Sequence, residues 1–143
     1  MEEIRTKRAY PNLYPGEDVV LKKHMFPDGS WYMGEWKDGK MHGRGLFMYA
    51  NGSWYEGDFD SDMFHGHGKR VILDGSWYEG EWKYDTIHGN GVLVEKSEEL
   101  GTMIRFEGHF TEGMKNGFGR MVYADESFFY GEWKYGEIHY GDS

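Results

Sequence analysis

Aromatic residues and glycines alternate with polar residues along most of this chain, in runs typical of β-strands. The first two runs are 30–37 and 43–50, and Gly, Asp or Asn residues bound each of them. Short runs that alternate with period two and are rich in aromatic and β-branched residues predict strands, not helices. Each such pair of runs is therefore expected to form two neighbouring strands.

The pair of runs returns along the chain as a repeat. A phrase close to Tyr-x-Gly-Glu-Trp begins at Tyr32, Tyr55, Tyr78, Phe106 and Phe129, so three of its intervals are 23 residues long and one is 28. A fixed period of roughly 20 to 50 residues indicates an array built from one supersecondary unit. We therefore predict units that start near 30, 53, 76, 104 and 127, the last of them truncated and without its second strand.

The residues between the units predict how the strands are joined. Asp28-Gly29, Asn51-Gly52 and Asp74-Gly75 tolerate positive φ and are expected to form two-residue type I′ hairpin turns. Such short connections make neighbouring strands antiparallel. A two-stranded unit is marginal alone and needs its neighbours. The predicted fold is all-β, an elongated, twisted, single-layer antiparallel sheet of about ten strands.

The array is predicted to occupy 19–141, between an amino-terminal extension at 1–18 and a tail at 142–143. A half repeat at 19–29 precedes the first unit, and its residues 19–26 are expected to form one strand that caps the sheet. Residues 95–102 lengthen one connection and create the 28-residue interval. An insertion of this kind predicts an exposed loop, either simply solvated or used for docking or regulation.

Glycines at fixed places suggest how a single layer is stabilised. Side chains alternate faces along a strand, so Tyr32, Gly34 and Trp36 are expected on one face, with Gly43 and Gly45 of the next strand beside them. Large rings could then lie over bare glycine backbone. The predicted structural residues are Tyr32, Gly34, Trp36, Gly43, Gly45, Tyr55, Gly57, Phe59, Gly66, Gly68, Tyr78, Gly80, Trp82, Gly89, Gly91, Phe106, Gly108, Phe110, Gly117, Gly119, Phe129, Gly131 and Trp133.

The phrases at Tyr32, Tyr55 and Tyr78, each followed by a His-Gly-x-Gly tetrad at 42, 65 and 88, resemble the MORN (membrane occupation and recognition nexus) repeat. The resemblance covers about four fifths of the chain. It implies a twisted β-hairpin array that acts as a protein-interaction scaffold, often in cytoskeletal or ciliary assemblies and at membrane-associated junctions.

The carboxyl-terminal units depart from the family pattern. Asn116 replaces the His of the fourth tetrad, and Tyr140 occupies a glycine position of the fifth. The end of the array is therefore expected either to fray or to have its open edge completed by another chain, a second copy included.

Composition narrows the classes of partner. Lys and Arg number 16 against 25 Asp and Glu, which gives a formal net charge of −9. This charge opposes binding to nucleic acid, which we exclude as a partner, and to anionic lipid. The chain contains no cysteine, and no export signal or run of eighteen apolar residues. The predicted location is therefore cytoplasmic, with the resemblance adding a cytoskeletal or ciliary association.

Two ladders of titratable residues recur with the repeat. His42, His65, His88 and His139 share one register position, but equivalent residues in successive hairpins lie about 9 to 10 Å apart, too far to share a zinc ion. His65 and His67 are the only close pair. Glu35, Asp58, Glu81 and Glu132 form an acidic ladder, expected on a solvated face. No motif of an enzyme is present. No metal, cofactor or catalytic residue is therefore predicted, and a small hydrolase or transferase with a site at an oligomer seam stays the least favoured class.

A third ladder, which we call the aromatic stripe, consists of Trp31, Trp54, Trp77 and Phe128. Alternation places it on the face opposite Tyr32. Such residues are favoured in binding hot spots, although they could instead pack on one another, on Met33 or on the stems of Lys37 and Lys40.

The predicted function is a non-enzymatic scaffold that binds a partner protein with a basic or apolar segment on its aromatic surface. A groove on the other face could also accept an extended or helical segment. The alternative is a peripheral membrane or phosphoinositide adaptor.

Overall fold

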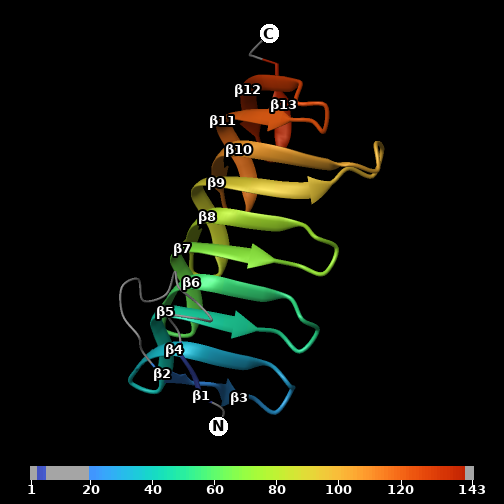
Figure 1. Cartoon of the computed structure of the whole chain (residues 1–143). Coiled ribbons are helices and arrows are strands. Elements are labelled where there is room, and N and C mark those ends of the chain that lie inside the picture. Colours follow the sequence, from blue (N-terminus) through green and yellow to red (C-terminus); the bar gives the residue numbers. More distant parts are fainter. Residues whose placement is uncertain (1–2, 6–19, 141–143) are drawn as a thin grey trace.

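The computed structural model describes residues 3–5 and 20–140, so the predicted tail at 142–143 and most of the predicted extension lie outside it. Eleven strands form one sheet and two more form a small separate sheet (Figure 1). The strands are β1 Glu3–Arg5, β2 Val20–Lys22, β3 His24–Met25, β4 Trp31–Lys37, β5 Lys40–Met48, β6 Trp54–Asp60, β7 Met63–Val71, β8 Trp77–Lys83, β9 Thr86–Lys96, β10 Met103–Thr111, β11 Met114–Val122, β12 Phe128–Lys134 and β13 Glu137–His139.

The large sheet follows the order of the chain, from β3 at one edge to β13 at the other. Every neighbouring pair whose register is described is antiparallel, as the short connections require. The predicted all-β, single-layer antiparallel array is therefore confirmed, with eleven strands in place of about ten.

Both edges of the sheet differ from prediction. Residues 20–22 pair with β1, Glu3 opposite Lys22, so they leave the main sheet and only β3 pairs with β4. The prediction of one capping strand over 19–26 is therefore wrong for the described residues, Val19 lying outside them. At the other edge the last unit does have a short second strand, β13, with Ile138 opposite Trp133. A tight turn at Tyr135-Gly136 is enough to start this pairing.

The turns between the units differ from prediction. Asp28, Asn51 and Asp74 do not have positive φ, so they do not form type I′ turns. Instead the Gly29 amide donates to the Phe26 carbonyl at 3.1 Å, which is a type I turn followed by a left-handed glycine. Consecutive positive φ angles, typical of type I′ turns, occur inside the units at Asp38-Gly39, Ser61-Asp62, Tyr84-Asp85, Glu112-Gly113 and Tyr135-Gly136.

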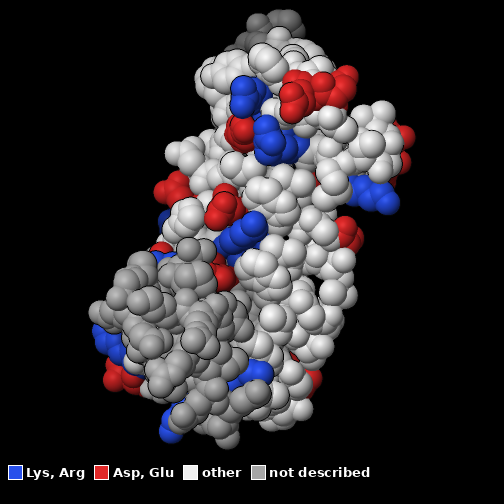
Figure 2. Space-filling view, viewed as in Figure 1, with Lys and Arg blue, Asp and Glu red and all other residues white. Residues whose placement is uncertain are grey.

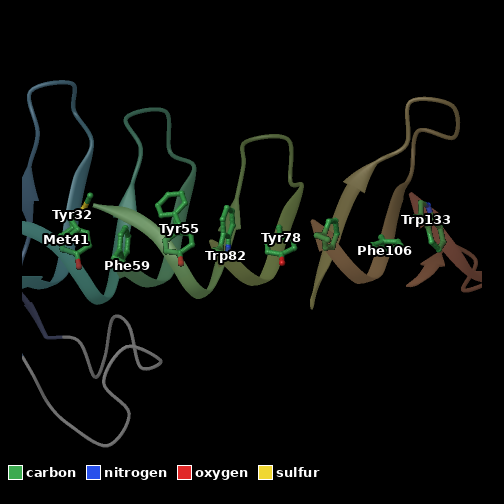
Figure 3. Packing of buried hydrophobic residues seen from close by; sticks show 10 residues of the cluster. Tyr32, Met41, Tyr55, Phe59, Tyr78, Trp82, Phe106 and Trp133 are labelled. Atoms are coloured by element: carbon green, nitrogen blue, oxygen red, sulfur yellow. The ribbon is translucent and has the colours of Figure 1, made fainter. Parts of the chain in front are cut away.

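A β-bulge in four of the hairpins bends the sheet into a trough. The register shifts between Gly34 and Trp36, and again at the equivalent places in the next three units. On the partner strand Gly43 has a φ of 71°, in the left-handed region. A bulge bends the strand and increases its twist. The hairpins therefore curve around one side of the sheet, as Figures 1 and 3 show; we call this side the inner face and the other side the outer face.

The inner face holds a continuous row of buried rings along the length of the array (Figure 3). Tyr55 is fully buried and stacks on Phe64 with ring centroids 3.8 Å apart, while Phe59 meets Tyr55 edge-on. The curvature thus encloses a narrow core without a second layer. Its buried members are Tyr32, Met41, Tyr55, Phe59, Phe64, Tyr78, Trp82, Phe106, Phe110 and Trp133.

The inserted residues form a longer hairpin. Strand β9 continues to Lys96 and β10 begins at Met103, so the connecting loop is 97–102, closed by a 2.8 Å hydrogen bond from the Ser97 amide to the Thr102 carbonyl. This hairpin projects beyond the others in Figure 1. Five of its six loop residues are exposed, with Ser97 intermediate.

Hydrogen bonds between turns join successive units. The Asp85 amide donates to the Phe64 carbonyl at 2.8 Å, and the Asp85 carboxylate accepts from the Phe64 amide at 2.8 Å. Asp62 makes the same two bonds with Met41 of the preceding unit. Gly113 and Gly136 stand at the position of Asp85 in the later units. Without a carboxylate they make only the backbone hydrogen bond, to the carbonyls of Ile87 and Lys115.

Replacing Asp85 with glycine should therefore lower the free energy of unfolding by about 1 kcal/mol, because it removes only the side-chain hydrogen bond from a backbone that glycine already adopts at 113. Denaturant unfolding of the full chain measures this difference. Asp85→Asn, which retains an acceptor, is the matched control and should lose less than about 0.5 kcal/mol. Equal stability of wild type and Asp85→Gly would contradict the role of this bond.

Candidate interaction surface

The tyrosines of the repeat lie over glycines on the inner face. A Cβ on Gly45 would lie less than 3.0 Å from the Tyr32 ring, and one on Gly68 less than 3.0 Å from the Tyr55 ring. The Tyr55 hydroxyl donates to the Asp58 carbonyl at 2.7 Å. The last glycine of the tetrad, at 45, 68, 91 and 119, is therefore a place where an aromatic ring requires the absence of a side chain. A Cβ on the glycine of the phrase, at 34, 57 or 80, would first meet the backbone of the neighbouring strand.

The first glycine of the tetrad behaves differently from prediction. No ring covers Gly43, Gly66 or Gly89; a Cβ there would instead meet the carboxylate-bearing side chain of Glu35, Asp58 or Glu81 on the outer face. The bulge and the positive φ of these glycines interrupt the alternation from which the faces were predicted. Gly117, their equivalent in the fourth unit, approaches His109.

The acidic ladder is consequently part of the bulge and not simply a solvated row. The Asp58 carboxylate accepts a hydrogen bond from the His67 amide at 3.0 Å, and Glu35 and Glu81 accept from the Arg44 and Asn90 amides. No such bond is described for Glu132, whose partner strand ends at His139. These carboxylates satisfy backbone amides that the bulge leaves without a ladder partner.

Burial perturbs the titration of the inner-face tyrosines. Desolvation raises the pKa of Tyr55 and of Tyr78 far above the usual range, with the Asp58 and Glu81 carboxylates adding to the effect. Both hydroxyls therefore stay protonated and act as hydrogen-bond donors. On the outer face, burial likewise raises the pKa of Glu56.

The histidines make separate local contacts. His42 Nδ1 lies 3.6 Å from Asp60 Oδ1, whereas His65 Nδ1 accepts a hydrogen bond from the Tyr84 amide at 3.2 Å. His88 and His109 have ring centroids 6.5 Å apart. Residues 3–5 and 20–140 contain no group of three or more His, Cys, Asp or Glu side chains placed to hold a metal ion.

The aromatic stripe lies on the outer face and is partly covered by lysines. Trp31, Trp54 and Trp77 are half-buried. Lys23 Nζ lies 4.5 Å from the Trp31 ring centre, and Lys69 Nζ lies 4.5 Å from that of Trp77. These cation–π contacts involve lysines other than those considered from the sequence. Phe128, at 61% exposure, is the most open member.

The fourth unit interrupts the stripe. Arg105 stands at its position, in a cross-strand row that runs from Trp77 through Val94, Arg105 and Val122 to Phe128. Because the arginine is not a ring, a depression of about 580 Å³ opens between Trp77 and Phe128. Its two arginines are already paired, since Glu107 binds Arg105 at 3.2 Å and Arg120 at 3.0 Å. The hydrogen bond from Arg120 lowers the pKa of Glu107.

Charges elsewhere on the surface are mixed in sign. The face seen in Figure 2 carries separated basic and acidic groups with uncharged areas between them. Lys69 and Arg70 are adjacent in sequence but point to opposite faces, Lys69 toward Trp77 and Arg70 toward Tyr49. Adjacent basic residues therefore do not form a basic patch here.

Some residues with clear roles carry no signal in the repeat phrase. Phe64 stacks on Tyr55, and Asp85 joins two units. Both lie outside the repeat phrase and the tetrad, so only an alignment of the units by the position of their turns could have identified them. Arg70, on the inner face, stands where the neighbouring units have Phe47 and Leu93.

Comparison with known families agrees with this geometry. The model of the MORN repeat matches five consecutive segments, residues 32–54, 55–77, 78–94, 106–128 and 129–139. The chain belongs to the MORN repeat family. MORN repeats generally take part in protein or membrane interaction, and proteins built from them are typically non-enzymatic scaffolds. No curated protein matches this MORN chain. In the described part of the array, no helix is long and apolar enough to cross a membrane.

Proposed function

We propose that this MORN array is a non-enzymatic scaffold that binds a partner protein on its outer face, centred on the depression between Trp77 and Phe128. The observation that supports the proposal is the depression itself, about 580 Å³ in volume, in which two members of the aromatic stripe flank Val94, Arg105 and Val122. A concave site with apolar walls and a few polar groups is the usual form of a binding site.

The chemistry of the depression suits one inserted apolar side chain of a partner. Val94 and Val122 lie between the two rings in the cross-strand row. Large rings in desolvated pockets dominate most protein interfaces. The formal charge of −9 would favour approach of a basic partner, since electrostatic attraction accelerates encounter more than it strengthens the final complex.

Affinity purification from source cells, comparing wild type with the double variant Trp77→Ala/Phe128→Ala, tests this proposal. We expect proteins recovered by the wild type to fall at least tenfold with the variant, since loss of two hot-spot rings commonly removes more than 1.4 kcal/mol of binding. The matched control is Trp31→Ala, which removes the equivalent ring of the first unit, outside the depression. This variant should still recover the partners. Equal recovery by all three proteins, each with a cooperative thermal transition, would exclude this surface.

The setting of the scaffold is also a proposal. The family resemblance supports a cytoplasmic place in a cytoskeletal or ciliary assembly, and the identities of the recovered proteins test it. Flotation of the same proteins with phosphoinositide vesicles tests the alternative of a membrane adaptor. We expect no salt-sensitive flotation, because Lys69 and Arg70 lie on opposite faces and anionic-lipid sites require clustered basic residues.

A further inference from the structure

The inner face has an open pocket that the family pattern does not explain. It has a volume of about 580 Å³, and Ile72, Trp82, Ile87 and Leu93 supply apolar surface to it, with Arg70 also in its wall. The Trp82 indole nitrogen already donates to the Gly68 carbonyl at 3.0 Å, so the ring needs no polar partner in the pocket. A ligand would therefore meet a mainly apolar site with two cations in its wall, Arg70 and Lys96.

The pocket exists because the second and third units have smaller residues than the first. Near the amino-terminal end of the trough, Phe26 and Phe47 lie 5.9 Å apart and Phe47 meets Tyr49 at 4.9 Å, so rings fill the space. One unit later Ile72 stands at the position of Tyr49, since the two amides make equivalent turn hydrogen bonds. Leu93 likewise stands where the first unit has Phe47.

Arg70 has unused hydrogen-bonding capacity at this place. Its Nε atom is buried and has no hydrogen-bond partner, while its guanidinium carbon lies 4.9 Å from the Tyr49 ring centre. A buried polar atom without a partner destabilises the folded state and is uncommon in native structures. The stacking holds the guanidinium in one orientation beside the pocket.

The acidic residues of the pocket wall are already occupied. Asp85 accepts from the Phe64 amide and Asp74 from the Ser76 amide, both at 2.8 Å, and Glu95 lies 3.5 Å from Lys115. None of these contacts involves Arg70. The cation is therefore available to an incoming acceptor, and the carboxylates nearby disfavour an acceptor with more than one negative charge.

We propose that this pocket binds a partner peptide through one bulky apolar side chain and an adjacent carboxylate, the apolar group lying on Trp82 and Leu93 and the carboxylate on Arg70. An arginine fork matches a carboxylate with two parallel hydrogen bonds. The neighbouring acids make a dianionic phosphate the poorer ligand. This site shares only Trp77 with the lining of the Trp77–Phe128 depression and has its apolar group and its arginine on the inner face, so it goes beyond the proposed function and does not depend on it.

Panning a random dodecapeptide display library on the full chain tests the inference, with counter-selection on Arg70→Leu. This variant copies Leu93 of the next unit, so the array tolerates the residue at this register. We expect the selected peptides to share Asp or Glu within two positions of a bulky apolar residue. In fluorescence polarisation the best peptide should bind wild type at least tenfold more tightly than Arg70→Leu, and its Glu→Gln or Asp→Asn counterpart should lose a similar factor.

Two further variants separate binding from folding. Ile72→Tyr restores the ring that the first unit has at Tyr49 and should block the peptide by filling the pocket. Arg70→Leu should melt within about 2 °C of wild type or higher, because it removes a buried unpaired atom. Four outcomes would each overturn the proposal. They are selected peptides without an acidic residue, tighter binding of a phosphopeptide counterpart, equal affinity of the peptide for wild type and Arg70→Leu, and failure to select any peptide. Phe128→Ala, which changes the depression at a residue that does not line this pocket, should still bind the peptide.

Discussion

Replacing Tyr55 with alanine should lower the free energy of unfolding by about 4 kcal/mol, the largest loss that we expect from one side chain of the array. Tyr55 is fully buried, and its ring contacts Phe59, Phe64 and Trp82. Its removal would leave a cavity at the centre of the trough and also take away the hydrogen bond to the Asp58 carbonyl. A narrow core has few other residues that could move to fill the space.

Urea unfolding of the full chain, followed by tryptophan fluorescence, measures this loss. Tyr55→Phe should lose only about 1 kcal/mol, because it removes the hydroxyl and retains the ring, as Phe106 does naturally one unit beyond Tyr78. Trp36→Ala is the control for an aromatic residue of the same motif that is 42% exposed, and it should lose clearly less than Tyr55→Ala. Similar losses for Tyr55→Ala and Trp36→Ala would mean that the trough is not the source of stability.

Replacing Gly68 with alanine should lower the free energy of unfolding by about 3 kcal/mol, although the change adds only one methyl group. The new Cβ would lie less than 3.0 Å from three atoms of the Tyr55 side chain, two of the ring and the hydroxyl oxygen. The ring cannot retreat, because Phe64 stacks on it and Trp82 meets it edge-on. The strain must therefore be taken up by the backbone of β7 or by the packing of neighbouring units.

A double-mutant cycle isolates the proposed contact. Tyr55→Leu in the Gly68→Ala background should lose less free energy than Tyr55→Leu alone, because the smaller side chain relieves the clash. Gly39→Asn is a control for glycine replacement as such: Gly39 has a φ of 78° and nothing within 4 Å of an added Cβ, and asparagine tolerates this conformation. Additive losses in the cycle would contradict direct contact between the ring and Gly68.

The repeat period made the fold predictable. Residues that share a register, such as Tyr32 and Tyr55, must have equivalent neighbours, so one hairpin with its turns determines the rest of the array. The placement of the aromatic stripe on the opposite face from these tyrosines followed from strand alternation alone. Alternation is reliable over short distances because each residue of a regular strand rotates the side chain to the other face.

Predictions failed where the backbone leaves the regular strand. Gly43 and Gly45 are two residues apart and were placed together, but the bulge sends Gly43 to the side of Glu35. A glycine in a strand can mark a bulge, a close approach or a turn, and its residue type does not distinguish these cases. The turns between units were predicted wrongly for a similar reason, since Asp-Gly suits both a type I′ turn and a type I turn followed by a left-handed glycine.

The candidate sites depend on differences between units more than on the repeat itself. Arg105 interrupts the stripe and Arg70 interrupts the inner row, and neither belongs to the recurring motif from which the sites were predicted. The depression and the pocket then depend on the sizes of several side chains in adjacent strands, which spacing along one strand does not reveal.

The strand order has a mechanical consequence. Since β3 to β13 lie side by side in chain order, the long axis of the array runs across the strands, and ten strand spacings of 4.8 Å give it a length of about 48 Å. Tension between its two ends would pull neighbouring strands apart sideways. The backbone bonds of one ladder would then break in succession, starting most easily at β3, which pairs with β4 through only two residues.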